Sequence, residues 1–258
     1  STLLASSAAS DVYKRQDLTY NFVTDFEKFL YESGYQTNTV AKHMKHLKSF
    51  VNAAINKGYI DPNNYAFRRY KIKMKEGKHV FLLPEEMKKL EEVSLTGRNS
   101  CLEHTLDAFL FCCYTGLRYS DFVNLNEKNI VKIDGKLWLI FDSVKTGTEV
   151  KLPLNLLFEG KALTLLQKYQ GKWSSFFSIK NNSSVNKELI RIGKLAKISK
   201  HFSFHSARHT NATLLIYKGA NITTVQKLLG HKNLATTQIY GEVMGSTIIR
   251  DLKKCQKR

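Results

Sequence analysis

The sequence predicts a mainly α-helical protein with one small antiparallel β-sheet, divided into two domains. Three observations predict this fold class. Apolar residues recur at intervals of three and four along most of the chain, as on the buried face of a helix. Between residues 130 and 153 they alternate instead with polar residues, as in strands joined by tight turns. A basic stretch with almost no apolar period, residues 68–79, separates two such regions.

The composition is that of a globular protein with excess positive charge. Hydrophobic residues make up 43% of the 258 positions, enough for two domains with a core each. The 40 Lys and Arg exceed the 22 Asp and Glu and give a formal net charge of +18. Such a surplus favours a polyanionic partner, above all nucleic acid. No apolar run could span a membrane and no signal peptide is visible, so we expect a cytoplasmic protein without a membrane partner.

The first domain, residues 17–67, is predicted to be helical. Residues 1–16 are rich in Ser and Ala and are expected to be a disordered or non-native lead-in. One helix should end at Gly34, and a second should run from about Thr37 to Gly58. Their expected buried faces carry Phe22, Phe26, Phe29 and Leu30 in the first helix and Val40, Met44, Leu47, Val51, Ala54 and Ile55 in the second.

Two groups of cations in this region are candidate contacts to a DNA backbone. One group repeats every three residues on the outer face of the second helix, and the other begins residues 68–79, the predicted extended linker. A charge run of this kind is most often only a solvated surface. Given the net charge of the chain, the candidates are Lys42, Lys45, Lys48, Arg68, Arg69, Lys71 and Lys73.

The second domain, residues 80–258, is predicted to combine helices with the sheet. The expected helices span about 84–93, 100–114, 155–169 and 185–196, with a short one after Thr115-Gly116. Three strands within IVKI, KLWLIF and EVKLPL should be joined by Asp134-Gly135 and by Lys145-Thr146-Gly147. The adjacent Cys112 and Cys113 lie in an apolar helical run and are expected to be reduced core thiols.

The stretch from residue 204 to 240 is the most informative part of the chain. Gly219 and Gly230 stand where helices would end, so three short helices are expected. His205 and Arg208 are three residues apart and therefore share a helix face. Alone, a histidine near a helix start is usually a cap, and a tyrosine near the end of a chain usually packs its ring. Together with His231, these residues would gather cations near one phenol, that of Tyr240.

The order of these residues resembles the catalytic domain of the tyrosine recombinases, the phage-integrase-like family. The matching motifs are H-x-x-R in HSAR, LGH at residues 229–231 and a tyrosine nine residues later. Two upstream motifs fit as well: T-G-L-R-x-x-D, with Arg118 and Asp121, and K-T-G at Lys145 followed by V-x-L-P. The resemblance covers roughly residues 17–258. Asn211 departs from it, because a larger apolar residue often follows the H-x-x-R-H run.

The resemblance implies a fold and partners. It implies an N-terminal four-helix-like core-binding domain and an α+β catalytic domain. It also implies double-stranded DNA as the substrate, a homotetramer on paired DNA sites, and accessory DNA-bending proteins as further partners. The segment after Tyr240, with Ile248, Ile249 and Leu252, would either dock on a neighbouring protomer or return to its own core.

The resemblance further implies the reaction, site-specific DNA recombination through a covalent 3′-phosphotyrosine link. A phenol with a pKa of about 10 loses its proton at pH 7 at a cost of about 4 kcal/mol, which fixed cations offset. The link conserves the energy of the broken bond, so no cofactor is expected, and no Asp/Glu cluster suggests a metal. The implied roles are nucleophile for Tyr240, phosphate binding for Arg118, Arg208 and His231, proton acceptor or relay for His205, proton donor to the leaving 5′-oxygen for Lys145, and support of Arg118 for Asp121.

Two other functions remain open at this point. A type IB topoisomerase-like enzyme shares the nucleophile and the phosphate-binding cations but relaxes supercoiled DNA without sequence choice. A non-catalytic DNA-binding protein would use the same arginines only to neutralise phosphates. Length and the fit of the local motifs favour the recombinase.

Overall fold

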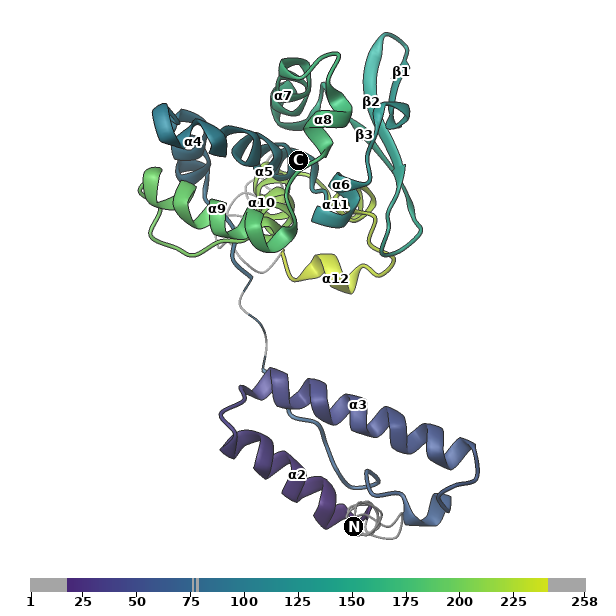
Figure 1. The fold of residues 1–258 in the computed structure, drawn as a ribbon. Coiled ribbons are helices and arrows are strands. Elements are labelled where there is room, and N and C mark those ends of the chain that lie inside the picture. Colours follow the sequence, from purple (N-terminus) through teal and green to yellow (C-terminus); the bar gives the residue numbers. More distant parts are fainter. Residues whose placement is uncertain (1–17, 76, 78, 241–258) are drawn as a thin grey trace, which may run out of the picture. The chain divides into compact units, whose positions relative to one another are not determined.

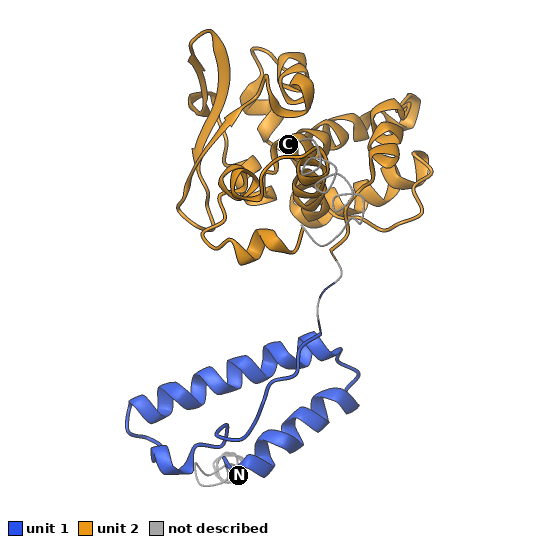
Figure 2. Ribbon diagram, turned by 180° about the vertical axis from the view of Figure 1, so that it is seen from behind, with its two compact units in different colours: residues 1–78 blue, residues 79–258 orange. Residues whose placement is uncertain are grey.

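The computed structural model describes residues 18–75, 77 and 79–240 (Figure 1). The chain divides into two compact units, residues 1–78 and residues 79–258 (Figure 2). The expected lead-in and the expected docking segment after Tyr240 lie outside the described residues. Among the described residues, no helix is both long and apolar enough to cross a membrane.

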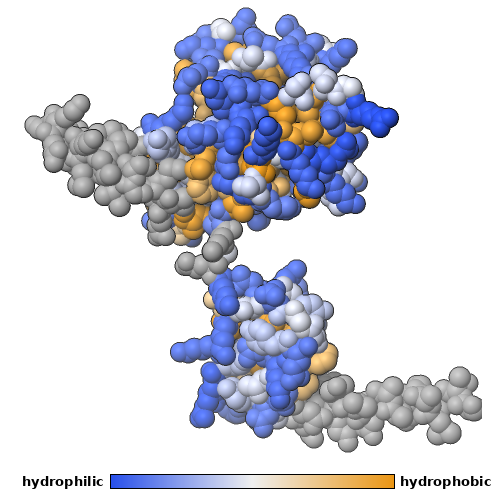
Figure 3. Space-filling view, turned by 90° about the vertical axis from the view of Figure 1, so that its left-hand side faces the viewer, coloured by the Kyte–Doolittle hydropathy of each residue, from blue (hydrophilic) through white to orange (hydrophobic). Residues whose placement is uncertain are grey.

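The described part of the first unit is a pair of helices closed by a returning segment. Helix α2 is Tyr20–Glu32, α3 is Thr37–Asn56, and the 3-10 helix η2 is Pro62–Asn64. A four-helix-like domain was expected here; within the described residues it consists of these two α-helices and one 3-10 helix. Figure 3 shows hydrophilic residues over most of one face of this unit. Its core consists of Val23, Leu30, Val40, Met44, Val51, Ala66, Phe67 and Tyr70.

Two expectations for this unit were wrong. Phe29 was expected on the buried face of α2, but it is 59% exposed, and Val23 is buried instead. The segment after residue 67 was expected to be an extended linker, yet Tyr70 packs into the core of the first unit. Further along, the main-chain N–H of Lys75 donates to the side chain of Asn38, and its carbonyl accepts from that same amide. The basic segment therefore lies against α3 as far as Lys75.

The second unit is organised around two helices, α5 (Glu103–Thr115) and α10 (Phe204–Tyr217), which pack against each other. Every residue of α5 from Thr105 to its end is buried. Figure 1 shows other helices around this pair and the sheet to one side. The remaining helices are α4 (Pro84–Glu92), η3 (Gly97–Leu102), α6 (Tyr119–Val123), η4 (Glu127–Asn129), η5 (Leu157–Gly160), α7 (Lys161–Lys168), α8 (Trp173–Phe177), α9 (Asn182–Leu195), α11 (Ile222–Leu229) and α12 (Ala235–Gln238).

The sheet has three antiparallel strands in the order β1-β2-β3, as predicted. The strands are β1 (Ile130–Ile133), β2 (Lys136–Asp142) and β3 (Glu149–Pro153). Asp134 and Gly135 both have positive φ, which suits the two-residue turn between β1 and β2. The predicted fold class is therefore confirmed, and Cys112 and Cys113 are buried free thiols, as expected.

The helix expected from residue 155 begins only at Lys161. Phe158 and Glu159 adopt left-handed backbone angles, which interrupts a helix there. The side chain of Phe158 is buried in the core of the second unit, so tertiary packing outweighs the local helical pattern. Helix α8, which places Phe176 and Phe177 in the same core, was not predicted.

The end of α5 requires a glycine, because Gly116 has a φ of 74° and lies against two side chains. An added Cβ would lie 2.6 Å from Leu229 Cδ2 and 2.8 Å from Asn211 Oδ1. We therefore expect Gly116→Ala to lower the free energy of unfolding by about 2–4 kcal/mol, the sum of left-handed strain and overpacking. Equilibrium urea unfolding measures this change.

Gly135→Ala is the matched control, since Gly135 has nearly the same φ, 76°, but nothing within 4 Å of an added Cβ. It should cost only the strain of the left-handed backbone, about 1 kcal/mol. Equal losses in the two variants would contradict the close approach at Gly116.

Candidate active site

The centre of the candidate site is the guanidinium of Arg208 on α10. The residue is 3% exposed. Its Nη1 donates to the carbonyl oxygen of Gly116 at 2.8 Å, and its Nη2 donates to that of Leu229 at 2.5 Å. These carbonyls end α5 and α11, so three helices fix the group. Two of the five N–H donors of an arginine are used in this way, and the remaining donors are oriented before any ligand binds.

Helix α10 is fixed at its start and along its buried side. The main-chain N–H of Phe204 donates to Asn186 of α9 at 2.8 Å, which satisfies a free amide at the helix N-terminus. Thr210 Oγ1 accepts from the main-chain N–H of Leu82 at 2.9 Å. Asn211, which departs from the family pattern, donates to the carbonyl oxygen of Cys113 at 3.0 Å and so ties α10 to the end of α5.

Arg118 lies between α5 and α6, at the helix corner where the sequence placed it. Its Nη1 donates to Ser143 Oγ at 2.9 Å and lies 3.4 Å from Asp121 Oδ2. Asp121 is 2% exposed, and its other oxygen accepts from the main-chain N–H of Val144 at 2.9 Å. One carboxylate therefore holds both Arg118 and the turn that bears Lys145.

Lys145 lies in the turn between β2 and β3 and is exposed, as expected. The turn is closed by the bond from the Gly147 N–H to the Ser143 carbonyl oxygen at 2.7 Å. It contacts the segment of His231 through Thr146 Oγ1, which lies 3.4 Å from the carbonyl oxygen of Gly230. The Lys145 ammonium contributes to the lowered pKa of His231, so its charge is felt inside the site.

His231 follows α11 directly, because Gly230 ends that helix with a left-handed φ of 62°. Its Nδ1 shares a hydrogen bond with Thr237 Oγ1 at 2.8 Å, which leaves Nε2 for a ligand. Burial, followed by the charges of Arg208, Arg118 and Lys145, lowers its pKa to about 4. At neutral pH this side chain is therefore an uncharged hydrogen-bonding group.

His205 lies on the first turn of α10, and its side chain reaches solvent. Loss of hydration on its protein side lowers its pKa, and Arg208, Arg118 and Lys145 lower it further. The same three cations thus act on both His205 and His231. Residues that are distant in sequence converge on one place.

Tyr240 follows α12 and is 5% exposed. Its ring packs in a small cluster with Ala212, Ile216, Val225 and Leu229. Burial raises the pKa of its phenol, while Arg208 and Arg118 oppose that rise. The phenol is therefore within electrostatic reach of both guanidinium groups.

The direct partner of the phenol was missed by the sequence reasoning. Tyr240 Oη lies 3.0 Å from Nδ1 of His209, the residue after Arg208 in HSARH. His205 was expected to accept the tyrosine proton, but among the described residues the hydrogen bond is to His209. The available signal was a second histidine one position beyond the H-x-x-R motif, four residues after His205 and therefore on the same face of α10.

The candidate DNA contacts all belong to the first unit. Lys42 and Lys45 are exposed on α3, and Lys48 is partly buried. The side chain of Arg68 donates to the carbonyl oxygen of Pro62 at 3.1 Å, so its position is constrained. Exposed positions are also held by Arg69, Lys71 and Lys73.

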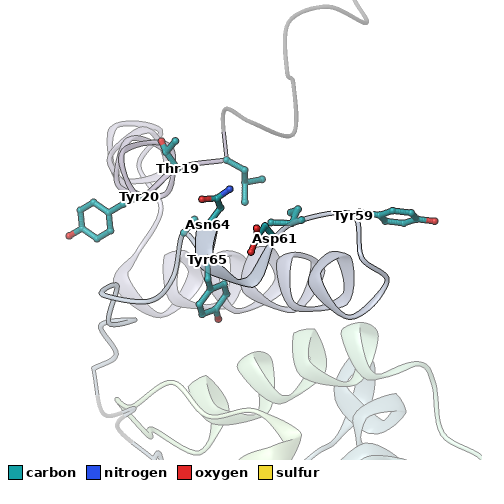
Figure 4. Close-up of a pocket in the computed structure, with 9 residues that line it drawn as sticks. Thr19, Tyr20, Tyr59, Asp61, Asn64 and Tyr65 are labelled. Carbon is teal, nitrogen blue, oxygen red and sulfur yellow. The ribbon is translucent and has the colours of Figure 1, made fainter.

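The first unit also has a hollow of about 470 Å³ (Figure 4). It lies between the start of α2 and the segment from Tyr59 to Ala66. Its carboxylate, Asp61, already accepts from the main-chain N–H of Asn63 and caps η2. Within the residues that the structure describes, no group of three or more His, Cys, Asp or Glu could hold a metal ion.

Comparison with known proteins decides the family. The model of the phage integrase family matches residues 80–245, and that of the phage integrase SAM-like domain matches residues 9–73. The chain belongs to the phage integrase family of tyrosine recombinases. It is thus a DNA strand-breaking and rejoining enzyme of site-specific recombination, and the prediction made from the HSAR, LGH and tyrosine motifs is confirmed.

Relatives of this integrase-family chain include tyrosine recombinase XerC of Oceanobacillus iheyensis, 30% identical over 88% of this chain and 77% of the relative. A tyrosine recombinase of Thermosipho africanus is 30% identical over 84% of this chain and 75% of its own. Among solved structures, a lambda integrase dimer bound to a COC' core site matches with a TM-score of 0.74 and 19% identity, over 90% of this chain and 83% of that one. XerH bound to palindromic difH substrate matches with a TM-score of 0.72 and 18% identity, over 94% and 74% of the two chains.

The double contact of Asp121 predicts a large effect of its removal. Asp121→Ala would leave the largely buried Arg118 without its carboxylate and the Val144 N–H without an acceptor. We expect a loss of roughly 3 kcal/mol in the free energy of unfolding, as is usual when one partner of a buried ion pair is removed. Asp142→Ala, at an exposed position on β2, is the control and should change that free energy by less than about 0.5 kcal/mol. Similar losses in both variants would show that the contacts of Asp121 do not stabilise the fold.

The lowered pKa of His209 predicts that acid destabilises the fold. Burial and neighbouring positive groups lower the pKa of His209 to about 3 from its ordinary 6.5, so the unfolded chain takes up a proton more readily than the folded one. Stability should therefore fall as pH drops below 6.5, and this residue accounts for at most about 3 kcal/mol by about pH 4. Urea unfolding at pH 6.5 and at about pH 4 measures this loss of stability in wild type and in His209→Asn. An equal acid-induced loss in that variant would rule out the contribution of His209.

Proposed function

We propose that Tyr240 cleaves double-stranded DNA by attacking a phosphodiester held by Arg118, Arg208 and His231, in site-specific integration and excision. The observation that carries this proposal is a buried guanidinium held by carbonyls rather than carboxylates, with a phenol beside it. Arg118, Lys145 and Arg208 bring three positive charges, and among the described residues Asp121 is the carboxylate bonded within this group. The group therefore has an excess of positive charge, which the negative charge of a phosphodiester would offset.

The electrostatics of Arg208 support an anionic ligand. Burial and the nearby Arg118 lower its pKa to about 10, which shows that its charge is poorly compensated in the free protein. A bound phosphate would offset that cost and accept bidentate hydrogen bonds from the free donors of the guanidinium. As the phosphorus becomes five-coordinate, charge grows on its non-bridging oxygens and these interactions strengthen.

The proposed step forms one bond and breaks one. Tyr240 Oη attacks phosphorus, the phenol proton passes to an imidazole, and the bond from phosphorus to the 5′-oxygen breaks. Lys145, on its exposed turn, gives a proton to the leaving oxygen. The product is a 3′-phosphotyrosine and a free 5′-hydroxyl. Attack by another 5′-hydroxyl reverses the step and joins new strands, without a nucleotide cofactor.

The wider assembly belongs to the same proposal. The exposed cations Lys42, Lys45, Arg69, Lys71 and Lys73 would contact the DNA backbone, with Lys48 and Arg68 alongside them. The lambda integrase and XerH structures that share this fold are complexes with DNA. Four copies of this chain would act on paired sites in the cytoplasm, together with DNA-bending accessory proteins.

A trapped covalent complex tests the reaction. The full chain is incubated with nicked suicide duplexes taken from the DNA that adjoins its own gene, and denaturing gels are searched for a protein–DNA adduct. Wild type should form the adduct, and Tyr240→Phe should form none while binding the same duplexes equally well. Arg208→Lys should slow adduct formation by about 100-fold, because it loses the fork that binds phosphate.

Two results would contradict the proposal in different ways. Binding without an adduct, and equal behaviour of Tyr240→Phe in every assay, would indicate a non-catalytic DNA-binding protein. Relaxation of any supercoiled plasmid by the protein alone, without paired sites, would indicate a type IB topoisomerase-like activity.

A further inference from the structure

His209 lies at the meeting point of Tyr240 and two other imidazoles. It is 9% exposed, and its Nδ1 lies 3.0 Å from the phenol oxygen. The ring of His205 meets it edge-on with centroids 4.7 Å apart. On the same helix, Arg208 is directly adjacent in sequence. His209 therefore connects the residues that bind phosphate to the nucleophile.

A third imidazole comes from the start of the second unit. The ring of His79 lies against His209 with centroids 4.6 Å apart. The segment that follows is fixed to α10, because the Leu82 N–H donates to Thr210, the residue after His209. The carbonyl oxygen of Phe81 accepts from Lys200 at 3.0 Å. His79, at the start of this fixed segment, is thus part of the environment of His209.

We propose that His209 is a positioning residue for Tyr240, holding the phenol oxygen beside the two guanidinium groups through its Nδ1 hydrogen bond. The inference rests on the proposed function only in taking Tyr240 as the nucleophile. In this proposal His209 positions the phenol, and His205, which is the more exposed residue, faces the substrate.

The chemistry around His209 suits this task. The groups that face it are His205, His79, Arg208, His231 and Tyr240, and the first four of these, together with burial, keep the imidazole neutral. A neutral imidazole has one nitrogen that accepts and one that donates, so it can hold a phenol without competing for the phosphate. A charged side chain at this position would add another cation or neutralise Arg208.

Ring packing is the rival explanation, because His209 and Tyr240 also contact each other as rings, with centroids 5.5 Å apart. Two substitutions separate the explanations. His209→Asn places an amide atom near the position of Nδ1 but removes the ring. His209→Phe keeps the ring and removes the hydrogen bond. If the hydrogen bond holds the phenol, the Asn variant should resemble wild type and the Phe variant should not.

The first measurement needs no DNA. Tyr240 is replaced by 3-fluorotyrosine in the full chain, and the shift of its fluorine resonance between H₂O and D₂O reports its exposure to water. We expect a small isotope shift, that of a buried site, in wild type and His209→Asn. In His209→Phe the isotope shift should approach that of the urea-unfolded protein. Circular dichroism confirms that each variant is folded, and His209→Leu replaces the Phe variant if that one is not.

The second measurement is the rate of adduct formation on the suicide duplexes at saturating protein. His209→Phe should be slowed roughly tenfold with unchanged DNA affinity, and His209→Asn by no more than about threefold, as expected for one hydrogen bond. A buried fluorine in His209→Phe together with an exposed one in His209→Asn would overturn the proposal in favour of ring packing. Faster cleavage by His209→Phe would also overturn it, because His209 would then restrain the nucleophile. Absence of any adduct in wild type would count against the proposed function alone, since the fluorine measurement is independent of cleavage.

Discussion

The site depends on two hydrogen bonds that the Arg208 guanidinium donates to the main-chain carbonyls of Gly116 and Leu229. Both carbonyls are available because α5 and α11 end there, and a terminal carbonyl of a helix lacks a partner within that helix. Left-handed glycines, Gly116 and Gly230, make those ends abrupt. The guanidinium thus satisfies two helix ends with one group, and the helices in turn fix the direction of its remaining donors. The position of the proposed phosphate-binding group therefore follows from where two helices end.

The same arrangement explains the unusual charge balance. A carboxylate partner would compensate Arg208 but would also occupy the donors that a phosphate needs. Carbonyl dipoles stabilise the cation only in part, and its lowered pKa reflects what remains uncompensated. Asp121, the carboxylate bonded within this group, binds Arg118 from the side and also accepts from the Val144 amide. Its single charge orients Arg118, so the group formed by Arg118, Lys145 and Arg208 keeps an excess of positive charge.

Much of this could be read from the sequence because it is local. Alternating residues and Asp134-Gly135 determine the hairpin, and the motifs around Arg118, Lys145, Arg208 and His231 mark the residues that converge. What could not be read depends on contacts between distant segments. Phe158 interrupts a helical pattern because its side chain is needed in the core, and Tyr70 draws a basic segment onto the first unit. His209 was missed for the same reason, because its partners His79 and Tyr240 are far from it in the sequence.

The pKa values of the histidines and of Tyr240 depend on the charge around them, and a bound phosphate would change that charge. Lowered pKa values leave His205, His209 and His231 uncharged at neutral pH, and each is lowered in part by neighbouring positive groups. An imidazole with so low a pKa is a weak base toward a phenol whose own pKa is raised by burial. A phosphodiester between Arg118 and Arg208 brings a negative charge that opposes those cations, so it raises the affinity of the imidazoles for a proton. In the proposed reaction, an imidazole therefore becomes a stronger base once the phosphate is bound, whereas in the free protein burial favours the protonated phenol.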